Sequence, residues 1–141
     1  MNKEIKQSLK RSICPVSCVL DILGDKWTLL VVRDLFMGKS TYSEIQKSPE
    51  GVPTNILADR LKRLQQEGII SKTRYQERPT RFDYKLTDKG KGLWPVMKEM
   101  MRWGNKYVPG TFPSDEIQKK YAPKRTGGKS SATGGAPSID T

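Results

Sequence analysis

Cys14 is the side chain in this sequence whose type and setting best suit covalent chemistry. It precedes Pro15, and because proline favours the first position of a helix, Cys14 is expected to be the N-cap residue. The positive helix end, together with Lys10 and Arg11, would lower the pKa of the Cys14 thiol and favour the reactive thiolate. Cys14 is therefore a candidate sensor of oxidants or electrophiles, and the alternative is a small structural cap residue.

The other reactive side chains argue against catalysis. Cys18 falls one helical turn after Cys14 on an apolar face, so we expect it in the core. The chain has no histidine, which excludes Ser-His-Asp catalysis and histidine-ligated zinc. Two cysteines within one helix are poor disulfide partners. Because the sequence also offers no paired carboxylates and no glycine-rich phosphate loop, we expect no enzyme activity, no metal site and no cofactor.

A second group of side chains, in residues 54–66, suits the reading of DNA bases. Leu57, Leu61 and Leu64 recur at helical spacing and predict a buried stripe. The opposite face carries polar groups. Asparagine can bind adenine, lysine can reach a guanine edge or a phosphate, and aspartate can accept from cytosine or only orient a neighbouring cation. The candidates are Thr54 as the helix cap, Asn55, Asp59 and Lys62, with Arg63 on one shoulder.

The distribution of charge is consistent with a polyanionic partner. The 141 residues include 26 Lys or Arg and 15 Asp or Glu. Residues 53–91 hold ten basic and five acidic groups, and a surplus concentrated in one segment indicates a surface that faces a polyanion. An ordinary solvated face is the alternative when the charge is taken alone.

A capping signal places a short helix before residues 54–66. Thr41 and Glu44 form a Thr-x-x-Glu capping box, which predicts that a helix begins there. The backbone N–H groups of a helix N-terminus can bind a phosphate. We therefore count Lys39, Ser40 and Thr41 among the candidate DNA-binding residues.

A β-hairpin is predicted after residues 54–66. Residues 69–75 form a β-prone run, and residues 81–86 alternate strictly, with apolar side chains on one face. Arg78 and Arg81 flank the charged tip between the two strands. Because arginine suits a narrow minor groove, both are expected to contact DNA.

The order of these elements predicts a winged helix-turn-helix. It is a mainly α fold with a small β-hairpin as the wing, and residues 54–66 are its recognition helix. A final helix after Thr87 carries an apolar stripe that we interpret as a dimerisation surface rather than a ligand pocket. The stripe consists of Val96, Met97, Met100, Met101 and Trp103.

Three segments are expected along the chain. Residues 1–13 would be a basic N-terminal arm, residues 14–110 the winged domain with its dimerisation helix, and residues 111–141 a flexible, largely disordered tail. No apolar run is long enough for a membrane span, and the N-terminus lacks signal-peptide features. These features favour a cytoplasmic, nucleoid-associated protein without a membrane partner.

Several motifs together resemble the HxlR-type bacterial transcription regulators, which are relatives of the MarR-type winged helices. The similar stretches lie in order between residues 14 and 104: Cys14-Pro-Val, Gly24-Asp-Lys-Trp27, residues 54–61, Glu67-Gly-Ile-Ile70, residues 81–90 and Trp103-Gly104. The resemblance implies a homodimer on a palindromic operator. It also implies that a cysteine at the site of Cys14 can sense electrophiles or oxidants, as in some members. Many members have Ser or Thr at the position of Pro53.

The sequence therefore predicts a sequence-specific transcription regulator, with repression as the expected mode. Its partners would be double-stranded DNA, a second copy of itself, and an effector that is either a small molecule or an oxidant. The alternative is an architectural protein that binds DNA without sequence preference. Affinity for random DNA at physiological salt separates the two, because a specific reader loses several kcal/mol there.

Overall fold

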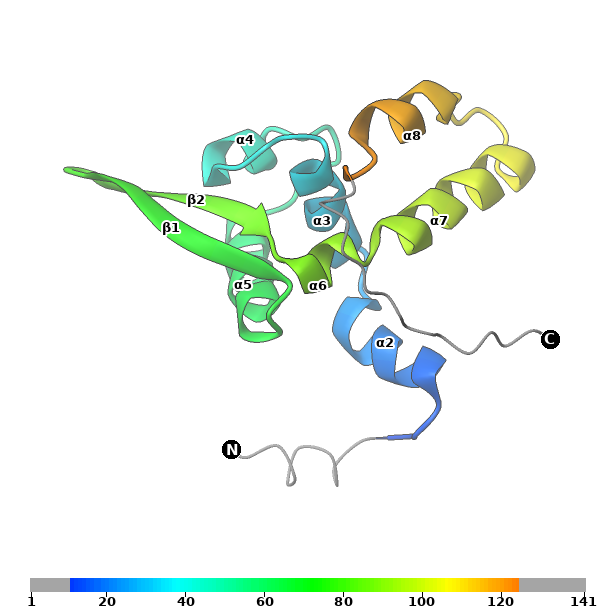
Figure 1. Cartoon of the computed structure of the whole chain (residues 1–141), viewed down its shortest axis with the longest axis horizontal. Coiled ribbons are helices and arrows are strands. Elements are labelled where there is room, and N and C mark those ends of the chain that lie inside the picture. The colour runs from blue at the N-terminus through cyan, green and yellow to red at the C-terminus, as the bar shows by residue number, and fades with distance from the viewer. Residues whose placement is uncertain (1–10, 125–141) are drawn as a thin grey trace.

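A computed structural model describes residues 11–124 of the chain. Within these residues the fold is mainly helical and carries one two-stranded antiparallel sheet. The hairpin extends from one side of the helices, and α2 and α7 lie on the other side (Figure 1). The elements in chain order are α2 (Pro15–Leu23), α3 (Thr28–Phe36), α4 (Tyr42–Gln46), α5 (Thr54–Gln66), β1 (Ile70–Glu77), β2 (Thr80–Leu86), α6 (Asp88–Lys91), α7 (Trp94–Tyr107) and α8 (Asp115–Tyr121).

The junction between α2 and α3 is organised by Asp25. Cys14 is the N-cap of α2, as expected, and Gly24 follows the helix end. Asp25 Oδ1 accepts hydrogen bonds from the backbone N–H groups of Trp27 and Thr28, at 2.9 and 2.7 Å. Because these contacts hold Asp25 and Lys26 outside the helix, α3 begins at Thr28.

Helix α5 has the predicted bounds and α4 begins where the capping box predicted, but one predicted cap is wrong. The capping box of Thr41 and Glu44 is present at the start of α4. Helix α5 covers Thr54–Gln66, and its N-cap is Pro53, with no side-chain cap bond. Pro53 has an extended backbone that leads directly into the helix, so Thr54 is the first helical residue and not the cap.

The hydrophobic core lies between α3, α5 and the base of the hairpin. Leu57, Leu61 and Leu64 are at most 2% exposed, which confirms the predicted leucine stripe of α5. They pack with apolar residues of the neighbouring elements, namely Leu23, Val31, Val32, Leu35, Ile45, Val52, Ile69, Ile70, Tyr84 and Met97.

The hairpin presents two chemically different faces. Cross-strand partners in an antiparallel pair point to the same face, and Lys72 pairs with buried Tyr84 while Arg74 pairs with Phe82. We call this the inner face. Arg81 and Lys85 alternate with these residues along β2 and therefore belong to the outer face. An irregularity in register lies between Arg74 and Gln76.

The segment after the hairpin is two helices rather than one. Thr87 caps only the short α6, and its Oγ1 accepts from the N–H group of Gly90 at 3.1 Å. Helix α7 then starts at Trp94, with Pro95 in its first turn. Proline lacks the N–H group needed to continue a helix from the preceding turn, so the chain restarts its helix at that position.

The chain continues in regular structure beyond residue 110, where the folded part was expected to end. Helix α8 follows a turn that is held by Asn105, whose Oδ1 accepts from the Ser114 N–H group and hydroxyl at 3.1 and 2.5 Å. Ser114 is buried. The expectation of a flexible tail is therefore wrong for the described part of residues 111–141. The Gly/Ser-rich residues 126–141 and most of the basic arm lie outside the described residues.

Candidate nucleic-acid interface

The exposed face of α5 carries the predicted base-reading side chains. Asn55, Lys62 and Gln66 are exposed, on the side of the helix opposite the buried leucines. The buried leucine stripe holds the helix on the domain, so this polar face can enter a major groove without loss of core packing. Asn55 lies in the first turn of the helix, which is the end that contacts base edges in helix-turn-helix proteins.

One of the charged candidates on α5, Asp59, has a partner inside the protein. Asp59 forms an ion pair with Arg60, and Arg60 Nε also donates to Asp25 Oδ2 at 2.8 Å. Burial alone would raise the pKa of Asp25, but hydrogen bonds from Thr28 and Trp27 and the charge of Arg60 lower it below its usual value. Arg63 lies beside Ile22 and Thr28, on the shoulder away from the hairpin.

A groove of about 610 Å³ separates α5 from the hairpin. Lys62 lines it from α5, and Lys72 lines it from the inner face of β1. The Lys72 ammonium lies 4.0 Å from the centre of the Phe82 ring, a cation–π contact that holds this long side chain over the inner face. The other lining residues are Tyr42, Ala58, Leu61, Gln65, Gln66 and Tyr84.

The hairpin contains basic residues that the sequence reasoning missed. Arg78 and Arg81 are exposed at the tip, as expected, but Arg81 is on the outer face. Lys72 and Arg74 are on the inner face and were not among the candidates. The strict alternation that placed Phe82 and Tyr84 on one face would also have identified them, had the register between the strands been known.

The residues predicted to bind a phosphate at the start of α4 have hydrogen-bond partners within the protein. The N–H groups of Ser40 and Thr41 donate to Glu44 Oε1 at 2.8 and 3.1 Å, and these bonds hold the pKa of Glu44 below its usual range. Lys39 Nζ donates to Ser48 Oγ at 2.6 Å. The Glu44 carboxylate therefore accepts the two N–H groups that were expected to bind a phosphate, and the Lys39 ammonium is held by Ser48.

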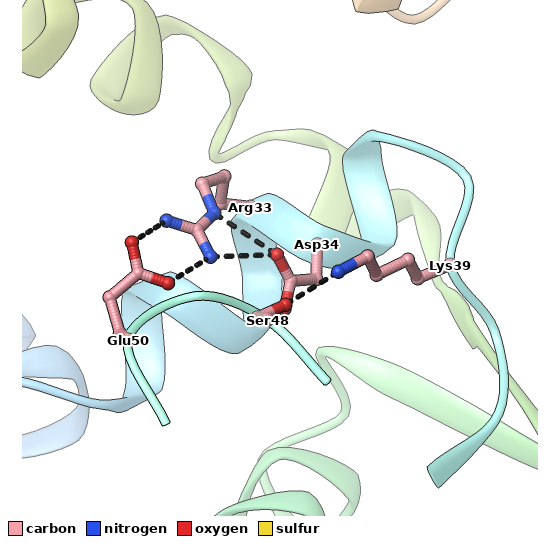
Figure 2. A network of polar contacts seen from close by, with 5 residues as sticks. All are labelled: Arg33, Asp34, Lys39, Ser48 and Glu50. Carbon is pink, nitrogen blue, oxygen red and sulfur yellow. Dashed lines mark hydrogen bonds and ion pairs between the residues drawn. The ribbon is translucent and has the colours of Figure 1, made fainter. Parts of the chain in front are cut away.

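Lys39 belongs to a network that joins α3 to the turn before α5 (Figure 2). Arg33 binds Glu50 through Nη1 and Nη2, at 2.7 and 2.8 Å, and binds Asp34 through Nε and Nη2. The hydrogen bonds to Glu50 raise the pKa of Arg33, and those from Arg33 lower the pKa of Glu50. Both groups therefore remain charged over the physiological pH range.

The predicted dimerisation stripe is divided between the core and the surface. Met97 is 7% exposed and belongs to the core, so its assignment to the stripe is wrong. Met101 is half-buried against that core. Val96, Met100 and Trp103 are 43, 53 and 63% exposed. The difference arises because only one side of α7 packs against the hydrophobic core, and Met97 lies on that side.

Cys14 is exposed, whereas Cys18 is half-buried and its Sγ donates to the carbonyl oxygen of Ser12 at 3.4 Å. Arg11, one of the two cations expected to act on Cys14, instead binds Asp21 at 2.8 Å. In residues 11–124 no group of three or more Cys, Asp or Glu side chains is placed to hold a metal ion. No helix in the same range is long and apolar enough to cross a membrane.

Known proteins share this arrangement. The HTH-type transcriptional regulator YvaP of Bacillus subtilis is 35% identical over 101 residues, which is 71% of this chain and 94% of YvaP. The solved structure of the transcriptional regulator YodB from B. subtilis, in its reduced form, matches 72% of this chain and all of YodB, with a TM-score of 0.58 and 29% identity. The redox regulator HypR in its oxidised form matches 66% of this chain and 96% of its own, with a TM-score of 0.61 and 29% identity.

The HxlR-like helix-turn-helix family matches residues 22–112. These residues contain the helix-turn-helix, the hairpin and α7, which are the elements that the structure brings together around α5. The fold and the relatives are those of DNA-binding transcription regulators and not of enzymes. This chain belongs to the HxlR-like helix-turn-helix family of transcription regulators.

Proposed function

We propose that the protein binds a palindromic operator as a homodimer and represses transcription from it. The observation that carries the proposal is the exposed polar face of α5, with Asn55 and Lys62, which is supported from behind by three buried leucines. In this arrangement α5 enters the major groove, Asn55 reads an adenine, and Lys62 contacts a guanine edge or a phosphate. A dimer bound over a promoter would exclude polymerase.

The DNA backbone would pass through the groove between α5 and the inner face of the hairpin. Lys62 and Lys72 line this groove from its two sides, and lysine ammonium groups are suited to phosphate oxygens. The hairpin tip, with Arg78 and Arg81, would then reach the adjacent minor groove. This placement adds Lys72 and Arg74 to the predicted DNA contacts and removes Lys39, Ser40 and Thr41.

The exposed apolar residues of α7 would form the dimer contact. Val96, Met100 and Trp103 are accompanied by Val16 and Leu20 of α2, which are 66 and 54% exposed. Both helices lie on the side away from the hairpin (Figure 1). Large exposed apolar surfaces usually mark interaction sites, and a two-fold dimer would bury both copies of this surface at once.

The protein would act in the cytoplasm, bound to the DNA of the nucleoid. Cys14 would be the residue that an oxidant or electrophile modifies. Its thiol is exposed at the start of α2, next to the proposed dimer contact. Two structural neighbours are the redox regulator HypR and the regulator YodB in its reduced form, which supports the same role here. A group added to the sulfur would displace α2 and change the spacing of the two recognition helices.

The function is tested by selecting binding fragments from random DNA with the purified protein. Asn55→Ala and Lys62→Ala should each weaken binding to the selected operator by roughly 1–3 kcal/mol, as expected for a lost bidentate base contact. Lys119→Ala on α8 removes one exposed charge elsewhere and should leave affinity nearly unchanged. If selection enriches no sequence, the architectural alternative holds; if both α5 variants bind like wild type, α5 does not read the DNA.

A further inference from the structure

We propose that Arg33 and Glu50 are positioning residues for sequence-specific DNA binding. Their ion pair attaches the turn between α4 and α5 to α3 and thereby sets the orientation in which α5 presents its reading face. This inference rests on the proposed function and concerns two residues that would not themselves read bases. It follows from the geometry of the network in Figure 2.

The guanidinium group of Arg33 is held by two carboxylates at once. Its Nη1 and Nη2 atoms donate to Glu50 at 2.7 and 2.8 Å, and its Nε and Nη2 atoms donate to Asp34 at 3.0 and 2.8 Å. The Arg33 side chain is 25% exposed. A planar, bidentate pair fixes the orientation of the carboxylate relative to the guanidinium as well as the distance between them. Glu50 can therefore occupy only a narrow range of positions relative to α3.

A second attachment lies two residues earlier in the same turn. Ser48 Oγ donates to Asp34 Oδ2 at 2.5 Å and accepts from Lys39 Nζ at 2.6 Å. Asp34 and Ser48 are 3 and 7% exposed. The turn is therefore attached to α3 at two points, at Glu50 through Arg33 and at Ser48 through Asp34. Two attachments restrict its rotation relative to α3 more than one would.

The attached turn leads directly into the reading end of α5. Glu50 is three residues before Pro53, the N-cap of α5, and Val52 between them is buried in the core. The hydroxyl of Tyr42 donates to the carbonyl oxygen of Thr54 at 2.9 Å, which ties α4 to the same point. A change in the turn would therefore be transmitted to Asn55, the first base-reading residue, where a small displacement disrupts a bidentate contact.

The charge of Glu50 makes the inference easy to test, because two explanations predict opposite signs. Glu50→Gln removes a negative charge close to the DNA-binding helix. If Glu50 acted only through its charge, this substitution would reduce repulsion from phosphate and strengthen binding to any DNA. If Glu50 positions α5, the substitution weakens binding to the operator and leaves binding to random DNA equal or slightly stronger.

The experiment measures the affinities of wild type, Glu50→Gln and Glu50→Asp for the operator selected with wild type and for random DNA. We expect Glu50→Gln to bind the operator roughly tenfold more weakly, since a bidentate charged contact is reduced to a single one. Glu50→Asp keeps the charge, but its side chain is one methylene shorter and does not reach both Arg33 nitrogens from the same backbone position. Its operator affinity should lie between those of wild type and Glu50→Gln. Glu116→Gln on α8, where the carboxylate is 91% exposed and 3.9 Å from Lys119, is the matched control.

Thermal unfolding followed by circular dichroism checks that each variant is folded at the assay temperature. A folded Glu50→Gln variant with unchanged or tighter operator binding would overturn the inference, since the pair would then be an ordinary surface ion pair. An equal loss on operator and random DNA would also overturn it, because it would indicate a smaller fraction of active protein. A wild type that shows no sequence preference would instead refute the proposed function.

Discussion

Lysines of this protein have different roles that depend on their surroundings. Lys39 donates to Ser48 within a partly buried network, whereas Lys62 and Lys72 line an open groove. Lys89 donates to the carbonyl oxygen of Glu67 at 2.6 Å, behind the end of α5. At the scale of single residues, a basic side chain is a candidate DNA contact only if its ammonium group lies on the surface that faces the groove.

The two faces of the hairpin allow a matched prediction. Lys72→Ala should reduce the slope of log affinity against log salt by about one, because each lost phosphate contact releases about one counterion fewer. Lys85→Ala removes the same charge from the outer face of the paired strand and should leave the slope unchanged. Gel-shift titrations at several salt concentrations measure both slopes. Equal slopes for the two variants would mean that the DNA does not pass along the inner face.

A second prediction at this scale concerns the two thiols. Treatment with N-ethylmaleimide forms a carbon–sulfur bond with an accessible thiolate, and modification of exposed Cys14 should release the protein from its operator. Wild type and Cys18→Ser should respond alike, and Cys14→Ser should remain bound. The measurement is fluorescence anisotropy of a labelled operator during the reaction. If Cys14→Ser is released at the wild-type rate, Cys14 is a structural cap and not a sensor.

The junction between the hairpin and α7 shows how tightly the elements constrain one another. The hydroxyl of Thr87 lies 2.6 Å from the carbonyl oxygen of Gly68, and the Thr87 N–H group donates to the carbonyl oxygen of Ile69 at 3.0 Å. Gly90 is buried at this crossing, where a β-carbon would lie 2.2 Å from the Ile69 carbonyl oxygen. The start of α6 therefore packs directly against the backbone that leads into β1.

Gly90→Ala should consequently destabilise the protein by about 1–3 kcal/mol, the usual cost of inserting a methyl group where the backbone must shift. Gly104→Ala on α7 is the control, because its added β-carbon would have no atom within 4 Å outside its own helix backbone and chain neighbours. Urea denaturation measures the free energy of unfolding of both. Equal stability of Gly90→Ala and wild type would mean that α6 can move away from β1 without cost.

At the scale of the whole molecule, the exposed apolar surface of α7 is the feature that the single chain leaves unexplained. Met97 and Met101 turn toward the domain, while Met100 and Trp103 turn away from it. Trp103 also contacts the Tyr107 ring in a tilted arrangement, with ring centres 5.1 Å apart, which extends the surface toward the end of the helix. We expect this surface to be covered by a second copy of the chain.

Met100→Glu should convert the protein from dimer to monomer at micromolar concentration, because it places a charge in an apolar contact. Binding to a two-half-site operator should fall strongly, since the paired recognition helices would no longer be held about 34–36 Å apart. Ala122→Glu adds the same charge at the end of α8 and should remain dimeric. Analytical ultracentrifugation gives the result, and a wild-type monomer with full operator affinity would contradict the prediction.

The sequence by itself determined the features that depend on neighbours along the chain. The bounds of α5, its leucine stripe, the capping box of Thr41 and Glu44, and the alternation of Phe82 and Tyr84 were all predicted correctly. Each depends on helical or strand periodicity, or on a hydrogen bond across three residues, and these are local properties. Together with the family motifs they were sufficient to identify a winged helix-turn-helix regulator.

Only the tertiary structure decided which of these residues are free to act. Arg60 meets Asp25 from 35 residues away, Arg33 meets Glu50 from 17, and Lys39 meets Ser48 from nine. Met97 is buried while Met100 is exposed, and Lys72 rather than Arg81 faces α5. These outcomes depend on how the elements pack and on the register between strands. Charge and periodicity show that a side chain can bind, but a partner brought close by folding decides whether it remains available.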